Sequence, residues 1–114
     1  PQPAAEFARS VGRALNTAVK YTKGQETVRT VCVVSGAGGD MTADAVALGA
    51  DCLLTGEASH HEGLDSLIPV IAATHYATET MIAGVLAQRL GERFPELKTE
   101  VFAGADPFSY IAKE

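Results

Sequence analysis

The chain has 114 residues, of which 46% are hydrophobic and 20% charged, and its formal net charge is −5. This length suits a single domain, residues 1–114, and this composition excludes a disordered chain. The nine lysines and arginines are scattered, whereas phosphate backbones require a clustered basic surface, so nucleic acid is not expected as the main partner. No apolar run is long enough to predict a membrane span.

The two cysteines indicate a reducing compartment. Cys32 and Cys52 each lie inside an apolar run, and both are predicted to be buried free thiols. A disulfide is the weaker alternative, because nothing else in the sequence suggests secretion. No signal-peptide pattern is visible, so we expect a cytoplasmic location.

The first third of the chain predicts one helix and two strands. Apolar side chains recur at every fourth position in segment 3–15, which is the pattern of an amphipathic helix. Residues 19–22 alternate apolar and polar side chains and indicate a half-exposed strand. Residues 28–35 are rich in β-branched side chains and indicate a buried strand. The two strands are close enough in sequence to pair antiparallel.

From residue 36 onward, helices and strands alternate. Such alternation predicts a layered α/β domain with a mixed, largely parallel sheet flanked by helices. Helices are expected at 41–49, 59–68 and 76–94, and strands at 50–56, 69–74 and 98–104, followed by a tail.

Three loops follow predicted strands, at residues 36–40, 55–61 and 74–79. Ligands of open α/β sheets collect at the carboxyl ends of the strands, and two of these loops carry all three histidines. The first loop, "SGAGGD", is either a tight turn or a ligand-facing loop. It matches neither the dinucleotide fingerprint nor the P-loop.

His75 and Glu79 are the best candidates for a metal site. At i, i+4 on a helix they share one face, and an imidazole with a carboxylate suits zinc, iron or manganese. The alternative is structural, because a carboxylate in the first turn of a helix is favoured in any case.

The second loop, "TGEASHH", holds Glu57, His60 and His61. Adjacent histidines diverge and rarely bind one ion together, so one of them is expected to face the site and the other solvent. If the helix from Ser59 buries a stripe of leucines and Ile68, both histidines lie near the buried side, and spacing alone hardly separates them.

These motifs together resemble one protein family. The chain reads "GADCLLTGE", then His61, then "HYATE" from His75 to Glu79, after a glycine-rich turn that follows "VVS". Over residues 28–110, this combination resembles the C-terminal part of the Ngg-one-interacting-factor-three family, whose members are often named GTP cyclohydrolase I type 2 homologues. Thr74 is a departure, because the family usually has glycine there, and we expect it to affect the turn more than ligation.

The resemblance implies that this chain carries half of a dinuclear metal site. His75 and Glu79 would be ligands, and a His-His pair and an aspartate would come from an N-terminal half outside this sequence. His61, rather than His60, would line the site without being a standard ligand. The chain is then expected to be a fragment, a natural half-length protein or one part of a split site.

The expected function is metal-assisted hydrolysis of a nucleotide-like or phosphate-bearing small molecule, with His61 or Glu57 moving protons or positioning the substrate. Two alternatives remain: a non-enzymatic metal-binding scaffold or regulatory interaction protein, and a plain α/β domain with structural histidines. A homo-oligomer is expected, because half of a larger fold exposes apolar surface. The resemblance also implies a homo-oligomer, because members of the family form hexameric rings.

Overall fold

The computed structural model describes residues 1–113. Its main sheet has four strands in the order β2-β6-β5-β4, in which β4, β5 and β6 are parallel and β2 is antiparallel to β6. The prediction of a mixed, largely parallel sheet flanked by helices is therefore confirmed. The strands are β2 (Lys20–Tyr21), β4 (Val31–Val34), β5 (Cys52–Thr55) and β6 (Val70–Ala72).

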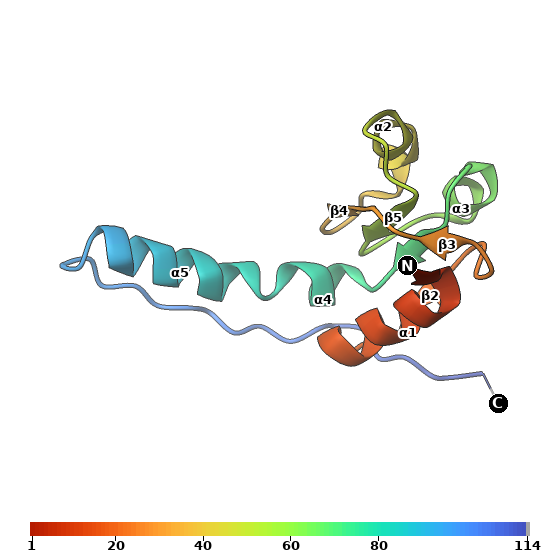
Figure 1. Cartoon of the computed structure of the whole chain (residues 1–114). Coiled ribbons are helices and arrows are strands. Elements are labelled where there is room, and N and C mark those ends of the chain that lie inside the picture. The colour runs from red at the N-terminus through yellow and green to blue at the C-terminus, as the bar shows by residue number, and fades with distance from the viewer. Residues whose placement is uncertain (114) are drawn as a thin grey trace.

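Helices cover both faces of this sheet (Figure 1). On one face, α1 (Ala4–Leu15) packs through Ala4 and Ala8 against Cys52 and Ile71. On the other face lie α2 (Thr42–Ala47), whose Ala45 packs against Leu53, and α3 (His60–Asp65). A short antiparallel pair, β1 (Gln2–Pro3) with β3 (Thr27–Val28), lies beside α1. The result is three layers with a core on each side of the sheet.

The helix predicted at 3–15 is confirmed as α1. Small side chains at Ala4 and Ala8, which are 0% and 1% exposed, let the helix backbone approach the sheet closely. The helix ends at Asn16, which takes the left-handed conformation with φ 50°. Asparagine is among the residues that tolerate this conformation, so it is a suitable helix terminator.

The predicted antiparallel pairing of residues 19–22 with 28–34 is wrong. Tyr21 pairs with Ile71 of β6, and β4 lies at the opposite edge of the sheet, paired with β5 alone. The two crossovers through α2 and α3 place β4, β5 and β6 side by side and leave the far side of β6 open to β2. As an edge strand, β4 is incompletely covered, and Val33 is 66% exposed.

The helix predicted from Ser59 is confirmed, but its buried stripe is not. The hydroxyl of Ser59 accepts a hydrogen bond from the Glu62 amide, and the Glu62 carboxylate accepts one from the Ser59 amide, forming a capping box. Leu64 and Leu67 are 69% and 79% exposed. The helix ends at Asp65 and its outer face is uncovered, so only Ile68, beyond its end, packs against the core.

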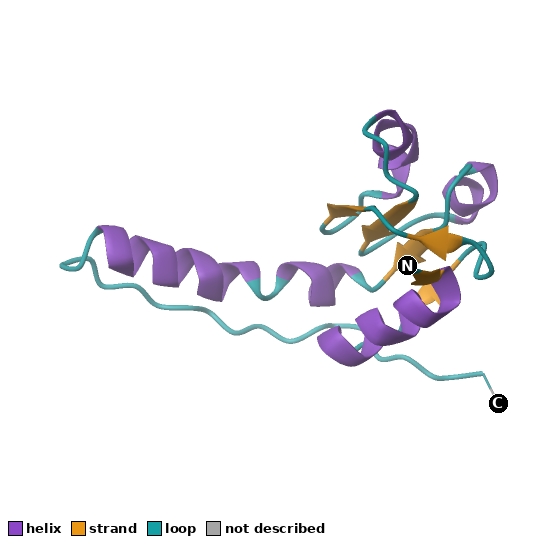
Figure 2. Cartoon of the chain, in the orientation of Figure 1, coloured by secondary structure: helices purple, strands orange, loops and turns teal. Residues whose placement is uncertain are grey.

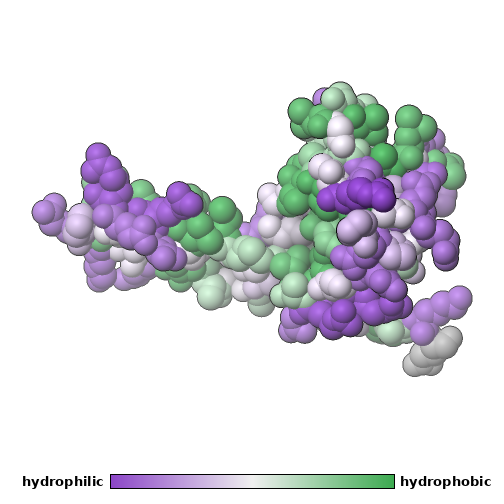
Figure 3. Space-filling view, viewed as in Figure 1, coloured by the Kyte–Doolittle hydropathy of each residue, from purple (hydrophilic) through white to green (hydrophobic). Residues whose placement is uncertain are grey.

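The helix predicted at 76–94 is divided into α4 (His75–Glu79) and α5 (Ile82–Arg93). Together they project from the sheet as an arm, and residues 94–113 run back along it (Figures 1 and 2). The strand predicted at 98–104 does not form. None of the residues of α5 is buried, and its apolar side chains stay open to solvent, as the arm in Figure 3 shows. These are Ile82, Val85, Leu86 and Leu90, with Met81 just before the helix.

Both cysteines are free thiols, as predicted, although Cys32 is only partly buried. Burial raises the pKa of Cys52 to about 12, so this thiol stays protonated and unreactive. In residues 1–113, no helix combines the length and the hydrophobicity needed to cross a membrane.

Candidate functional site

The site is built where the three parallel strands end. Thr55 of β5 is the register partner of Val34 of β4 and of Ala72 of β6, so the loops that follow these strands begin at one edge of the sheet. The amide of Glu57 donates to the Gly36 carbonyl (2.8 Å), and the amide of Gly36 donates to the hydroxyl of Thr78 (3.0 Å). One main-chain hydrogen bond and one to a side-chain hydroxyl therefore join all three loops.

His75 lies between two carboxylates. Its Nε2 atom is 3.0 Å from Glu79 Oε2, and its Nδ1 atom is 3.4 Å from Glu57 Oε2. The contact with Glu79 is the predicted i, i+4 pair on α4, whereas the contact with Glu57 comes from the second loop. The three side chains are about half exposed, at 45% for His75, 57% for Glu57 and 49% for Glu79. Solvent and ligands can therefore reach them.

The two carboxylates stabilise the protonated form of His75. Its hydrogen-bonding contact with Glu57 raises the pKa of His75 above the ordinary 6.5; partial desolvation opposes this, and the negative charge of Glu79 adds to it. A metal ion at Nε2 would replace the proton there, while Glu57 would keep the proton at Nδ1. A carboxylate that holds the second ring nitrogen in this way is typical of metal-bound histidines.

Gly36 brings the first loop directly against this pair. Its φ is 71°, a left-handed conformation that glycine adopts without strain. A Cβ atom built on Gly36 would collide with the Glu79 carboxylate and lie 3.3 Å from His75 Nε2. The absence of a side chain at Gly36 thus lets the backbone of the first loop lie directly against the His75 and Glu79 side chains.

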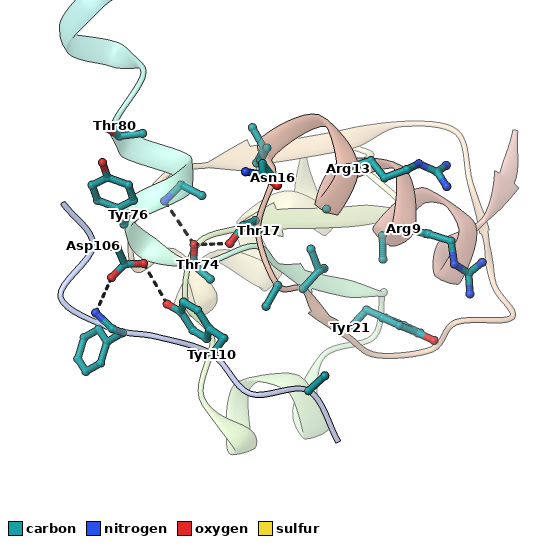
Figure 4. A pocket seen from close by; sticks show the side chains of 18 of the residues that line it. Arg9, Arg13, Asn16, Thr17, Tyr21, Thr74, Tyr76, Thr80, Asp106 and Tyr110 are labelled. Atoms are coloured by element: carbon teal, nitrogen blue, oxygen red, sulfur yellow. Dashed lines mark hydrogen bonds between the residues drawn. The ribbon is translucent and has the colours of Figure 1, made fainter. Parts of the chain in front are cut away.

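Thr74 holds the start of α4 in an unusual backbone conformation. Its φ is 68° and its ψ is 145°, a region that glycine occupies far more easily. Its hydroxyl accepts a hydrogen bond from the Ala77 amide (3.3 Å) and lies 3.0 Å from the Thr17 hydroxyl, as Figure 4 shows. The expectation that the threonine affects the turn agrees with this geometry.

His60 and His61 lie apart from this group. Both are exposed on α3, with their rings in edge contact at a centroid distance of 5.9 Å. Neither lines the cleft that contains His75 and Glu79, which α3 reaches through Glu62 and the capping residue Ser59. The structure therefore brings together Glu57, His75 and Glu79 of the predicted site residues. The roles predicted for them and for His61 stay predictions.

Residues 94–113, the returning segment, also contribute to this cleft, which was not predicted from the sequence. The Tyr76 hydroxyl donates to the Gly104 carbonyl (2.8 Å), and the Asp106 carboxylate accepts from the Phe108 amide (2.9 Å). Figure 4 shows Asp106 beside Tyr110, where burial and the Asp106 charge raise the pKa of the Tyr110 hydroxyl. Aromatic residues beside an Asp-Pro turn were the available signal. Nothing local indicated that this segment returns to α4.

The donor atoms of the cleft fit part of a metal site. His75 Nε2 and Glu79 Oε2 converge beside the backbone of Gly36, as one imidazole and one carboxylate ligand would. Glu57 meets the opposite ring nitrogen and so cannot share that ion. Over residues 1–113, no group of three or more His, Cys, Asp or Glu side chains is placed to hold a metal. A complete site therefore requires donors from elsewhere.

Comparison with known proteins shows which family this chain is related to. The model of the Duf34/NIF3 (NGG1p interacting factor 3) family matches residues 1–107. A relative in Pseudomonas aeruginosa is 34% identical over 82% of this chain and 38% of its own length, and one in Staphylococcus aureus is 30% identical over 93% and 31%. Both are named GTP cyclohydrolase 1 type 2 homolog. The chain thus spans about a third of the length of these curated relatives.

Two solved structures have a fold similar to that of this chain. Protein SA1388 of Staphylococcus aureus superposes with a TM-score of 0.83 at 26% identity, covering 96% of this chain and 34% of that one. Protein TTHA1606 of Thermus thermophilus gives 0.68 at 29% identity, covering 92% of this chain and 44% of that one. With a family model that covers nearly its whole length, the chain belongs to the Duf34/NIF3 (NGG1p interacting factor 3) family.

Proposed function

We propose that this chain is a divalent-metal-binding domain that contributes half of a dinuclear site. The observation that carries the proposal is the convergence of His75 Nε2 and Glu79 Oε2, which lie 3.0 Å apart beside the backbone of Gly36. Zinc, iron or manganese suits this pair of donors. The remaining ligands are donors outside this chain, either from another part of a longer protein or from another subunit.

The proposed reaction is hydrolysis of a nucleotide-like or phosphate-bearing small molecule. A divalent ion in such a site supplies an activated water and polarises the bond to be cleaved. Glu57 holds the proton on His75 Nδ1, which fixes the ring and leaves Nε2 free to bind. Glu57 is also better placed than His61 to move a proton, because it lines the cleft and His61 does not.

The alternative is a metal-binding scaffold or regulatory interaction protein that catalyses nothing. The observation that favours it is the large apolar surface outside the site. Leu48, Leu64 and Leu67 are 80%, 69% and 79% exposed, and Figure 3 shows apolar surface over α2 and α3. Surfaces of this kind mark contact with other proteins. They equally support a homo-oligomer, so association does not by itself decide between the two functions.

Metal uptake tests the proposal. Zinc or manganese affinity is measured by competition with a fluorescent chelator for the wild type, His75→Ala, Glu79→Ala and the double variant, with sedimentation of each sample. Because ligand shells are sensitive to single losses, either change should lower affinity at least about tenfold. Both side chains are half exposed, so the fold should survive.

His60→Ala is the matched control, since that imidazole is exposed and outside the cleft. It should bind metal as the wild type does. Equal uptake by the wild type and the double variant would refute the proposal. Turnover that is abolished by a chelator and restored by metal separates the hydrolase from the scaffold.

A further inference from the structure

A group of aromatic side chains lines the cleft that holds His75 and Glu79. Phe102 and Phe108 come from the returning segment, and Tyr76 comes from α4. Phe102 is 92% exposed and Phe108 is 69% exposed. One exposed phenylalanine is common, but several rings around one cleft beside a polar site indicate a binding surface.

Phe102 and Phe108 are largely exposed and Tyr76 is partly exposed, so a ligand can reach these rings. Among residues 1–113, the rings found in contact with each other are those of His60 and His61, which lie outside the cleft. The returning segment is tied to α4 by the hydrogen bond from the Tyr76 hydroxyl to the Gly104 carbonyl, 2.8 Å long. This bond keeps the segment that carries both phenylalanines at the rim of the cleft. Aromatic faces in such a position bind planar π systems.

The charges of the cleft select among planar ligands. Five carboxylates line it against a single lysine, Lys20, whose ammonium group donates to the Ala58 carbonyl at 2.8 Å. Without metal ions this field repels polyphosphates and favours an uncharged or cationic molecule. The carboxylates belong to Asp40, Glu57, Glu62, Glu79 and Asp106.

We propose that Tyr76, Phe102 and Phe108 form a stacking subsite for a planar, uncharged or cationic nitrogen heterocycle, in the same cleft as His75 and Glu79. The inference rests on the proposed function and narrows its substrate class. Recognition comes from the ring of the substrate, and any phosphate that it carries is accommodated only when metal ions offset the carboxylates.

Titration with 2-aminopurine riboside, an uncharged planar fluorophore, tests the subsite. The full chain is used in EDTA, so that the result does not depend on metal. Stacking should quench the fluorescence. Phe102→Leu and Phe108→Leu keep an apolar side chain but remove the ring, and each should weaken binding about fivefold or more. Phe94→Leu is the control, because that ring lies outside the cleft under the Arg93 guanidinium and its loss should change nothing.

Absence of quenching in the wild type would overturn the inference, as would equal binding by the leucine variants. Tighter binding of the corresponding 5′-triphosphate in EDTA would overturn the charge argument and with it the ligand class. Circular dichroism of each variant verifies the fold. If the fluorophore does not bind but metal uptake still depends on His75, only the stacking subsite is rejected. If metal uptake does not depend on His75, the metal proposal is rejected, and the fluorophore titration still tests the subsite.

Discussion

Gly36 and Glu79 lie so close together that a Cβ atom on Gly36 would collide with the Glu79 carboxylate. The first loop and the last helix of the site therefore fix each other, although they are far apart in the sequence. The left-handed backbone of Gly36, with φ 71°, reinforces this requirement for glycine.

We predict that Gly36→Ala lowers both stability and metal affinity. The left-handed conformation costs an alanine roughly 1–2 kcal/mol, and the new methyl group displaces the Glu79 carboxylate from His75. Urea unfolding and the metal competition assay measure the two effects. Gly84→Ala is the control, since a Cβ there would have no atom within 4 Å beyond its own stretch of helix, and neither quantity should fall. Unchanged metal affinity in Gly36→Ala would contradict the contact between Gly36 and the Glu79 carboxylate.

Thr74 supports a second prediction, which compares two substitutions at one position. Thr74→Gly relieves a backbone strain of about 1–3 kcal/mol but loses the cap on Ala77, which contributes about 1 kcal/mol. Thr74→Ala loses the same cap and keeps the strain. Thr74→Gly should therefore be more stable than Thr74→Ala by about 1 kcal/mol or more in urea unfolding. The reverse order would show that the backbone at Thr74 is not strained.

Asp51 provides the pH prediction. Its carboxylate accepts hydrogen bonds from the Thr30 amide (2.9 Å) and the Arg29 amide (3.0 Å), and these lower the pKa of Asp51 below 3.8. A depressed folded-state pKa gives stability that is present above the unfolded-state value and is lost as the pH falls through the folded-state value. Asp51→Asn should thus be less stable than the wild type at pH 7, and the gap should close below pH 3.8.

Urea midpoints at several pH values measure this gap. Asp65→Asn is a useful control because Asp65, at the end of α3, is exposed. It should give no comparable pH-dependent loss. A constant difference between Asp51→Asn and the wild type from pH 7 to pH 3 would mean that the backbone hydrogen bonds do not depend on the charge.

The sequence predicted those parts of the fold that local patterns determine. Alternating helices and strands gave the parallel order of β4, β5 and β6, and Ser59 marked the start of α3. The pairing of β2 was missed because it depends on which sheet edge stays open after the crossovers. The exposure of Leu64 was missed for a related reason, since periodicity shows which face of a helix is apolar but not whether another element covers it.

In the site, too, local patterns predicted some contacts, and the tertiary structure determined the others. The proximity of His75 to Glu79 follows from helical spacing, and the structure places them 3.0 Å apart. The contact between His75 and Glu57 joins two loops through the register of β5 and β6, which the sequence did not specify. The return of Phe108 to the cleft depends on the path of a segment without regular secondary structure, where no periodic signal exists.

The exposure of α5 affects how the arm becomes ordered. The twelve residues of α5 include no buried side chain, and an isolated helix of this length is only marginally stable in water. The hydrogen bonds of α5 should therefore open at little cost and exchange their amide protons quickly until another surface covers the apolar side. If the chain associates as proposed, ordering of the arm and assembly are a single thermodynamic event, in which the partner supplies the free energy that the helix itself lacks.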